Sequence, residues 1–169
     1  MALSKRLISR IEIANETGMS ATAVSRLVNE LIEQGLIYET SKFSGGVGRK
    51  AVMLALKEDW AYTAGILLKK RSIHIGLVNF KGELIDSISI THFAQKSTPS
   101  ATLNLVVESI NQLLATLQIP KHKLVGLAMG IPGIVDFAAG IVRYSTLLDW
   151  RNVNVKEKNS RELPGSYLC

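Results

Sequence analysis

Four polar side chains between positions 22 and 29 are spaced so that they share one face of a helix: Thr22, Ser25, Arg26 and Asn29. Arginine can bond to both acceptors of guanine, and asparagine pairs in the same way with adenine. Small residues such as threonine and serine let a helix enter the major groove, and the helix cap, Ser20, lies at an N-terminus that can face a phosphate. The pattern predicts sequence-specific DNA contact; the alternative is an ordinary helical hairpin with a solvated polar face.

Two short helices joined by a glycine turn would position these side chains. Ser9 and Glu12 have the spacing of a capping box, and Gly18 stands where a left-handed residue must stop the first helix. Ser20 then begins a second helix over residues 21–34. Apolar residues at three- and four-residue spacing predict its inward face: Val24, Leu27, Val28, Leu31 and Ile32. The combination predicts a helix-turn-helix.

A basic, glycine-rich segment comes next, between strands predicted at 36–39 and 51–56. Three basic residues stand in it with no acidic residue among them: Lys42, Arg49 and Lys50. Contact with phosphates is their natural use, and Arg49 on a thin glycine loop can enter a narrow minor groove. A flexible solvated hairpin is the alternative. With this wing, residues 1–58 are predicted to form a winged helix-turn-helix domain.

Composition limits the classes to which the protein can belong. A chain of 169 residues, 47% of them hydrophobic, can hold a small DNA-binding module and an α/β part with its own core. The apolar runs are too short to span a bilayer and the first residues do not read as a secretory signal, so we expect no membrane partner and a cytoplasmic location. One cysteine, Cys169, excludes an internal disulfide and a cysteine-based zinc site, and no cofactor or metal is expected.

The second half, residues 59–169, reads as α/β. Three antiparallel strands are predicted at 62–68, 72–79 and 83–90, then a helix capped by Ser100, then an apolar strand at 124–129. A glycine-proline loop stands at the C-terminal end of that strand, where ligands commonly bind in α/β sheets. The candidate effector-binding residues are Pro132, Gly133 and Asp136. Alternatively, the proline and glycine only shape a turn, and the aspartate caps the segment after it.

Taken in order, these features resemble the ROK family of sugar-responsive repressors and sugar kinases. The winged helix, the GGVGRK segment, VGLAMGIPGIVD and GIVRYSTLLDW carry the resemblance over nearly the whole chain. It implies the first half of a ribonuclease-H-like, actin-type ATPase domain after the winged helix. It also implies a sugar effector that lowers operator affinity, and homo-oligomers on palindromic double-stranded DNA. Within the family, the chain is most similar to xylose repressors.

Three departures from the family pattern shape the expected activity. Where ROK kinases carry an aspartate and a Gly-Gly-Thr phosphate loop, this chain has Leu67, Lys69 and Lys70, so we expect no kinase activity. The family's further sugar ligands and its cysteine-rich zinc motif have no counterpart before Cys169, and we interpret residues 159–169 as a frameshift product. Residues 1–8 offer at most two turns of the helix that normally precedes a helix-turn-helix in a winged helix.

The leading hypothesis is a sequence-specific DNA-binding repressor of sugar-utilisation genes, as a fragment. Three alternatives remain open. The chain could be an inactive relative of the sugar kinases, a regulator without sugar control whose α/β half only dimerises, or a non-functional remnant.

Overall fold

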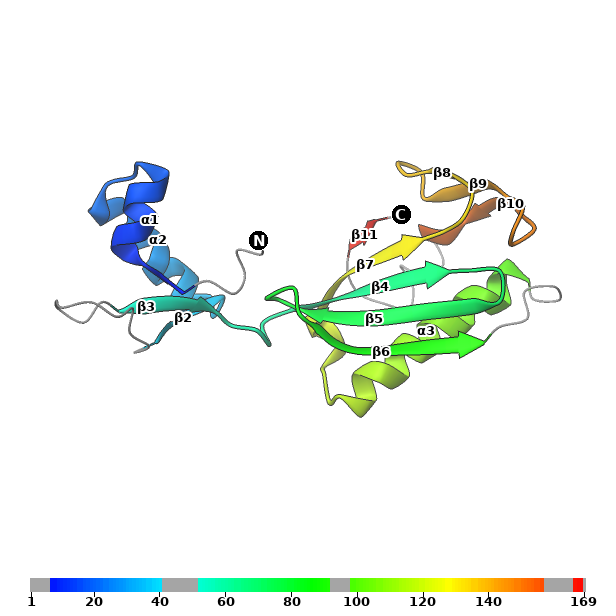
Figure 1. Cartoon of the computed structure of the whole chain (residues 1–169), viewed down its shortest axis with the longest axis horizontal. Coiled ribbons are helices and arrows are strands. Elements are labelled where there is room, and N and C mark those ends of the chain that lie inside the picture. Colours follow the sequence, from blue (N-terminus) through cyan, green and yellow to red (C-terminus); the bar gives the residue numbers. More distant parts are fainter. Residues whose placement is uncertain (1–6, 41–51, 92–97, 157–165, 169) are drawn as a thin grey trace. The chain divides into compact units, whose positions relative to one another are not determined.

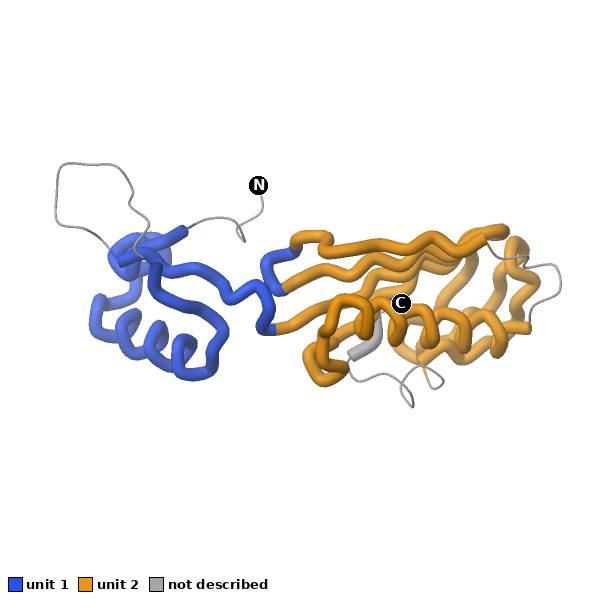
Figure 2. The backbone as a smooth tube through the Cα atoms, turned by 90° about the horizontal axis from the view of Figure 1, so that it is seen from below, with its two compact units in different colours: residues 1–60, 80–82 blue, residues 61–79, 83–169 orange. Residues whose placement is uncertain are grey.

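The computed structural model describes residues 7–40, 52–91, 98–156 and 166–168, and the chain forms two compact units (Figure 2). Unit 1 comprises Met1–Trp60 and the turn Phe80–Gly82, and unit 2 comprises Ala61–Asn79 and Glu83–Cys169. Each unit has its own cluster of buried apolar side chains. Each can therefore be considered as a separate folded body.

Helix α1 (Arg10–Thr17) begins with the capping box that the sequence predicts. The Oγ of Ser9 accepts a hydrogen bond from the backbone N of Glu12 at 3.2 Å, while the Glu12 carboxylate accepts one from the backbone N of Ser9 at 2.7 Å. Gly18 ends the helix at φ +70°, a conformation that glycine adopts without a steric penalty. Both the start and the stop of α1 are confirmed.

Helix α2 (Ala21–Glu33) is capped by Ser20, as predicted, through a hydrogen bond of 3.2 Å from the backbone N of its third residue. Val24 and Val28 are buried, at 1% and 3% exposed. Two of the five predicted apolar residues also face the sheet but are not fully packed, because they line a hollow between α2 and β3. These two are 37% and 39% exposed: Leu27 and Leu31.

A small antiparallel sheet completes unit 1. Its strands, in spatial order, are β1 (Ile8–Ser9), β3 (Met53–Leu56) and β2 (Ile37–Thr40). The two strands flanking the wing are therefore confirmed, with β3 starting two residues later than predicted. Leu54 of β3 packs against the buried valines of α2, which fixes the helix on the sheet. The tip of the wing lies outside the described residues. So do the three predicted DNA contacts of the wing, Lys42, Arg49 and Lys50.

Unit 2 is built on a five-stranded sheet (Figure 1). In spatial order its strands are β11 (Ser166–Leu168), β7 (Leu124–Gly130), β4 (Tyr62–Leu68), β5 (Ser72–Asn79) and β6 (Leu84–Thr91). β4, β5 and β6 are antiparallel neighbours, as the sequence predicts, whereas β7 runs parallel to β4 and β11 runs parallel to β7. Burial alternates along β4 and β5, so one face of the sheet forms the core.

Helix α3 (Pro99–Thr116) lies along that core face of the sheet (Figure 1). Its cap is Thr98, whose Oγ1 accepts a hydrogen bond from the backbone N of Ala101 at 3.2 Å, so the prediction of Ser100 as the cap is wrong. The physical reason is Pro99, which has no N–H to satisfy and a φ suited to the first helical position. A short 3-10 turn, η3 (Lys121–Lys123), leads into β7. The buried side chains of α3 include Leu103, Val106, Val107, Ile110, Leu113 and Leu114.

A second, three-stranded antiparallel sheet comes after β7 in the chain. It consists of β8 (Ile134–Asp136), β9 (Ile141–Ser145) and β10 (Trp150–Asn154), with β9 in the middle. Trp150 and Val142 from this sheet belong to the same core cluster as α3, so the small sheet is part of unit 2 and not a separate hairpin. No helix in the described part of the chain is both long and apolar enough to cross a membrane.

Candidate nucleic-acid interface

The outer face of α2 carries the polar residues that the sequence singles out. Thr22, Arg26 and Asn29 are exposed, Ser25 is half-buried, and the side chain of Arg26 is 73% exposed. Helical spacing places Thr22, Arg26 and Asn29 away from the buried valines, whereas Ser25, three residues before Val28, lies at the border of this face. The exposed cap, Ser20, lies at the N-terminal end of the same helix. The structure therefore brings the predicted α2 residues together on one accessible face.

Two arginines in unit 1 already have acidic partners. Arg26 lies 3.8 Å from the carboxylate of Glu30, one turn along α2, and both side chains are largely exposed. An exposed pair of this kind contributes about 0.3–0.5 kcal/mol, so it does not prevent Arg26 from reaching a DNA base. Arg10 is held more closely, 2.6 Å from Glu39.

Asn29 has a partner that sequence reasoning missed. Its Oδ1 accepts a hydrogen bond of 3.1 Å from the same guanidinium of Arg10 that binds Glu39. The three residues come from α1, α2 and β2. Arg10 is 19 positions from Asn29 and 29 positions from Glu39 in the chain. No local spacing rule connects such positions, and the sequence offered no signal for the cluster.

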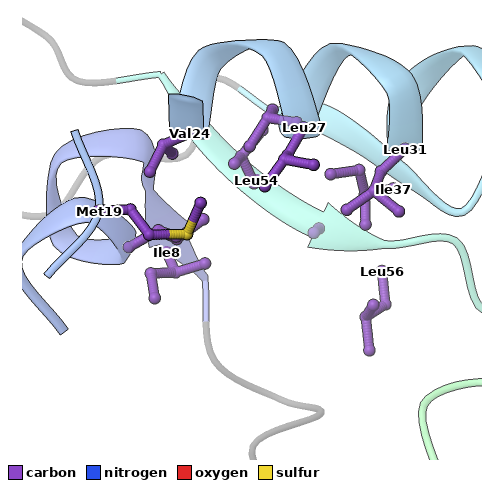
Figure 3. A pocket seen from close by; sticks show the side chains of 11 residues that line it. Ile8, Met19, Val24, Leu27, Leu31, Ile37, Leu54 and Leu56 are labelled. Carbon is purple, nitrogen blue, oxygen red and sulfur yellow. The ribbon is translucent and has the colours of Figure 1, made fainter. Parts of the chain in front are cut away.

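An apolar hollow of about 460 Å³ lies between α2 and the small sheet of unit 1 (Figure 3). Leu27 and Leu31 of α2 face Leu54 and Leu56 of β3 across it. Every residue that lines it is apolar, and the remaining members are Ile8, Ile13, Met19, Val24, Val28, Ile37 and Ala55. A sugar needs hydrogen-bond partners for its hydroxyl groups, so this hollow does not suit a sugar effector.

The predicted effector loop between β7 and β8 is closely packed on its own hairpin. The hydroxyl of Ser145 donates a hydrogen bond to the carbonyl oxygen of Pro132. Gly133 has φ +155°, and a Cβ at this position would collide with the carbonyl oxygen of Tyr144. Glycine is therefore required here by the close approach of two backbone segments.

Asp136 uses both of its carboxylate oxygens within the hairpin. Oδ1 accepts a hydrogen bond from the backbone N of Ala139 at 3.1 Å, and Oδ2 accepts one from Arg143 at 2.7 Å. The backbone hydrogen bond from Ala139, and then the one from Arg143, hold the pKa of Asp136 below its ordinary value. This geometry favours the alternative in which the aspartate caps the turn after β8.

The segment expected at the place of the kinase phosphate loop forms a tight turn. The backbone N of Lys69 donates to the carbonyl oxygen of Ser72 at 2.9 Å, which closes the turn between β4 and β5. Leu67, at the position of the kinase aspartate, is 46% exposed and has no carboxylate to offer a magnesium ion. Among the described residues, no group of three or more histidine, cysteine or acidic side chains could hold a metal.

Comparisons with known proteins agree with this two-part structure. Residues 1–50 match the model of the MarR family, and residues 70–164 match that of the ROK family. The xylose repressor of Caldicellulosiruptor bescii is 29% identical over 91% of this chain and 38% of its own length. The xylose repressor of Bacillus spizizenii is 26% identical over 88% and 38%, and the dual regulator NagC of Escherichia coli is 24% identical over 89% and 36%. The chain thus spans a little over a third of the length of these relatives.

The fold is also that of a solved ROK transcriptional regulator, described as a homolog of the E. coli MLC protein. The two structures superpose with a TM-score of 0.68 at 22% identity, covering 95% of this chain and 41% of that one. The predicted order of a winged helix-turn-helix followed by an α/β domain is confirmed. Because the ROK match covers residues 70–164, more than half of the chain, this chain belongs to the ROK family.

Proposed function

We propose that this chain binds specific sites on double-stranded DNA and represses genes of sugar utilisation. The observation that carries the proposal is the polar face of a well-capped α2, on which Thr22, Arg26 and Asn29 are exposed. Relatives named xylose repressor and N-acetylglucosamine repressor support it. A homo-oligomer would place two copies of α2 on the two halves of a palindromic operator. Such a regulator works in the cytoplasm, beside its DNA.

Phosphate contacts are assigned to the wing, as a further part of this proposal. Seven acidic residues and three basic ones lie among residues 7–40 and 52–60, whereas Lys42, Arg49 and Lys50 lie in the segment between these ranges. The described surface of unit 1 is therefore a poor source of phosphate affinity. We therefore assign to the wing most of the positive charge that non-specific attraction to DNA requires.

Control by a sugar is the second part of the proposal, with xylose as the first candidate. Pro132, Gly133 and Asp136 would form part of the site, and the sugar would compete with Arg143 for the carboxylate or bond to the loop backbone. Titrating xylose, and N-acetylglucosamine in parallel, onto the protein–DNA complex tests this. Release of DNA by one sugar supports the site, whereas no release by either favours a regulator in which the α/β half serves association alone.

We propose that the protein has no kinase activity. The apolar Leu67 and the closed turn at Lys69 leave no carboxylate for magnesium and no open glycine loop for a triphosphate. Purified protein mixed with ATP, magnesium and xylose or glucose should release no ADP above a buffer blank. Sustained ADP formation that follows protein concentration through purification would contradict the assignment.

DNA protection tests the proposed function as a whole. A footprint on the DNA upstream of the protein's own gene should show a protected palindrome at protein concentrations that leave a shuffled duplex unprotected. The Arg26→Ala variant should lose this protection while keeping its folded far-UV signal. Equal protection of native and shuffled DNA by the parent protein would rule out a sequence-specific regulator.

A further inference from the structure

A single guanidinium connects three elements of unit 1. Arg10, the first residue of α1, donates from one terminal nitrogen to Oδ1 of Asn29 on α2 at 3.1 Å and from the other to Oε1 of Glu39 on β2 at 2.6 Å. The Arg10 side chain is 26% exposed, so it is largely enclosed by these neighbours. Asn29 belongs to the proposed DNA-reading face, and Glu39 lies at the base of the wing. Arg10 therefore contacts both parts of the proposed interface.

This contact determines which way the amide of Asn29 points. A guanidinium carries only donors, so the amide atom that faces Arg10 must be the oxygen and not the nitrogen. The ion pair with Glu39 holds the other end of the planar guanidinium, which limits its rotation. Within the described part of the chain, the amide nitrogen of Asn29 has no hydrogen-bond partner, and its two N–H groups are available to a ligand.

We propose that Arg10 is a positioning residue that makes Asn29 a hydrogen-bond donor toward DNA; this rests on the proposed function. A freely turning asparagine binds adenine with its oxygen and its nitrogen together. Because the bond to Arg10 turns the oxygen toward α1, Asn29 presents its N–H groups outward, and guanine offers two acceptors, N7 and O6, in the major groove. Asn29 therefore reads guanine, in contrast to the adenine that the residue type alone suggests.

A plain phosphate contact is the competing role for Arg10. The close pair with Glu39 argues against it, because the carboxylate offsets the positive charge that a phosphate would attract. The two roles differ in what they do to sequence preference. A phosphate contact affects all sequences alike, whereas a positioning residue changes the preference at one base pair.

Base-preference measurements on the full chain separate these roles. Each base pair of the operator is replaced in turn, and the affinity of the protein for each altered duplex is measured. The base pair at which the Asn29→Ala variant no longer prefers one base over another is the pair that Asn29 contacts. Arg10→Met should shift the preference at that same pair from guanine toward adenine by about tenfold, and should have no further effect there in the Asn29→Ala background. Lys57→Met, which removes an exposed charge from the same unit, should leave all base preferences unchanged. If Arg10→Met weakens binding to every duplex equally and the guanine preference remains, the inference is wrong.

A measurement without DNA keeps the inference separate from the proposed function. The side-chain amide NMR signals of Asn29 in the free protein should move in Arg10→Met and in the milder Glu39→Gln variant, but not in Lys57→Met. Amide signals that stay in place in both variants overturn the positioning role, whatever the protein does with DNA. If the signals move but no duplex is preferred over a shuffled one, the positioning contact stands, while the base-reading role and the proposed function both fail.

Discussion

Among single residues, Arg26 gives the most direct test of base reading. Its side chain is 73% exposed and its ion pair with the Glu30 carboxylate is long, at 3.8 Å, so little is lost when it turns toward a base. Arg26→Ala should weaken operator binding by about 1–3 kcal/mol and relax the preference at one base pair. Affinities for a set of single-substituted duplexes would measure this.

Lys50 of the wing provides the contrast, as a proposed phosphate contact. Lys50→Ala should weaken binding to all sequences alike and reduce the slope of log affinity against log salt by about one. If Arg26→Ala and Lys50→Ala have the same effect on sequence preference, the separate roles assigned to α2 and the wing are incorrect.

Asp136 makes a pH-dependent contribution to the stability of unit 2. Hydrogen bonds from Ala139 and Arg143 lower its pKa in the folded protein below the ordinary 3.8, so its ionised form stabilises the fold above that value. This contribution is lost as the pH falls through the lowered pKa. Asp136→Asn should therefore lower the melting temperature at pH 7, and the difference from the parent should shrink as the pH falls below 3.8.

Asp149 serves as the matched control for this measurement. It has a positive φ of 55°, which asparagine also tolerates, so Asp149→Asn shows what the same substitution does outside the pair of Asp136 and Arg143. If Asp136→Asn lowers the melting temperature by the same amount at pH 2 and at pH 7, the shape of the side chain, and not its ionisation, explains the effect.

Among the elements, the turn from β7 into β8 depends on one glycine. A Cβ at Gly133 would meet the backbone of Tyr144 and Ser145, and its φ of +155° is rarely adopted by other residues. Gly133→Ala should destabilise unit 2 by about 1–3 kcal/mol or more in urea unfolding. Gly65→Ala on β4, where a Cβ has no neighbour within 4 Å, is the control and should have little effect. Equal stability of the two variants would contradict the packing of this hairpin.

Much of the element order could be predicted because it is encoded locally. The capping box at Ser9, the left-handed Gly18 and the bounds of β4 and β5 follow from spacing and period alone. Sequence alone does not distinguish Thr98 from Ser100 as the cap of α3, because both carry a hydroxyl group, and the structure shows that Pro99 at the first helical position selects Thr98.

Tertiary contacts account for the features of the site that the sequence could not predict. The polar face of α2 follows from helical period, but the hydrogen bond that orients Asn29 needs Arg10 from another helix. The sequence likewise could not show that both oxygens of Asp136 are used within the hairpin, because Arg143 reaches it from the next strand. The wing contacts Lys42, Arg49 and Lys50 stay predictions.

At the scale of the whole molecule, the hollow of unit 1 leaves apolar surface open to small ligands. It measures about 460 Å³ and its lining is entirely apolar, which suits a dye such as anilinonaphthalene sulfonate. The native chain should therefore enhance the fluorescence of this dye, and Leu31→Gln in the wall should reduce the enhancement. Ile11→Gln, which changes a 71% exposed residue outside the hollow, is the control. The open hollow would be contradicted if the native chain did not enhance the dye's fluorescence. It would also be contradicted if Leu31→Gln and Ile11→Gln reduced the enhancement equally.

We propose that this chain, which spans a little over a third of its curated relatives' length, recognises DNA by sequence. The most direct test is the ratio of its dissociation constants for a palindromic duplex from upstream of its own gene and for a shuffled duplex of equal composition, at one fixed salt concentration. We predict a ratio of about a thousand, and a fall toward one in Arg26→Ala combined with Asn29→Ala. A ratio near one for the folded parent protein would contradict the account.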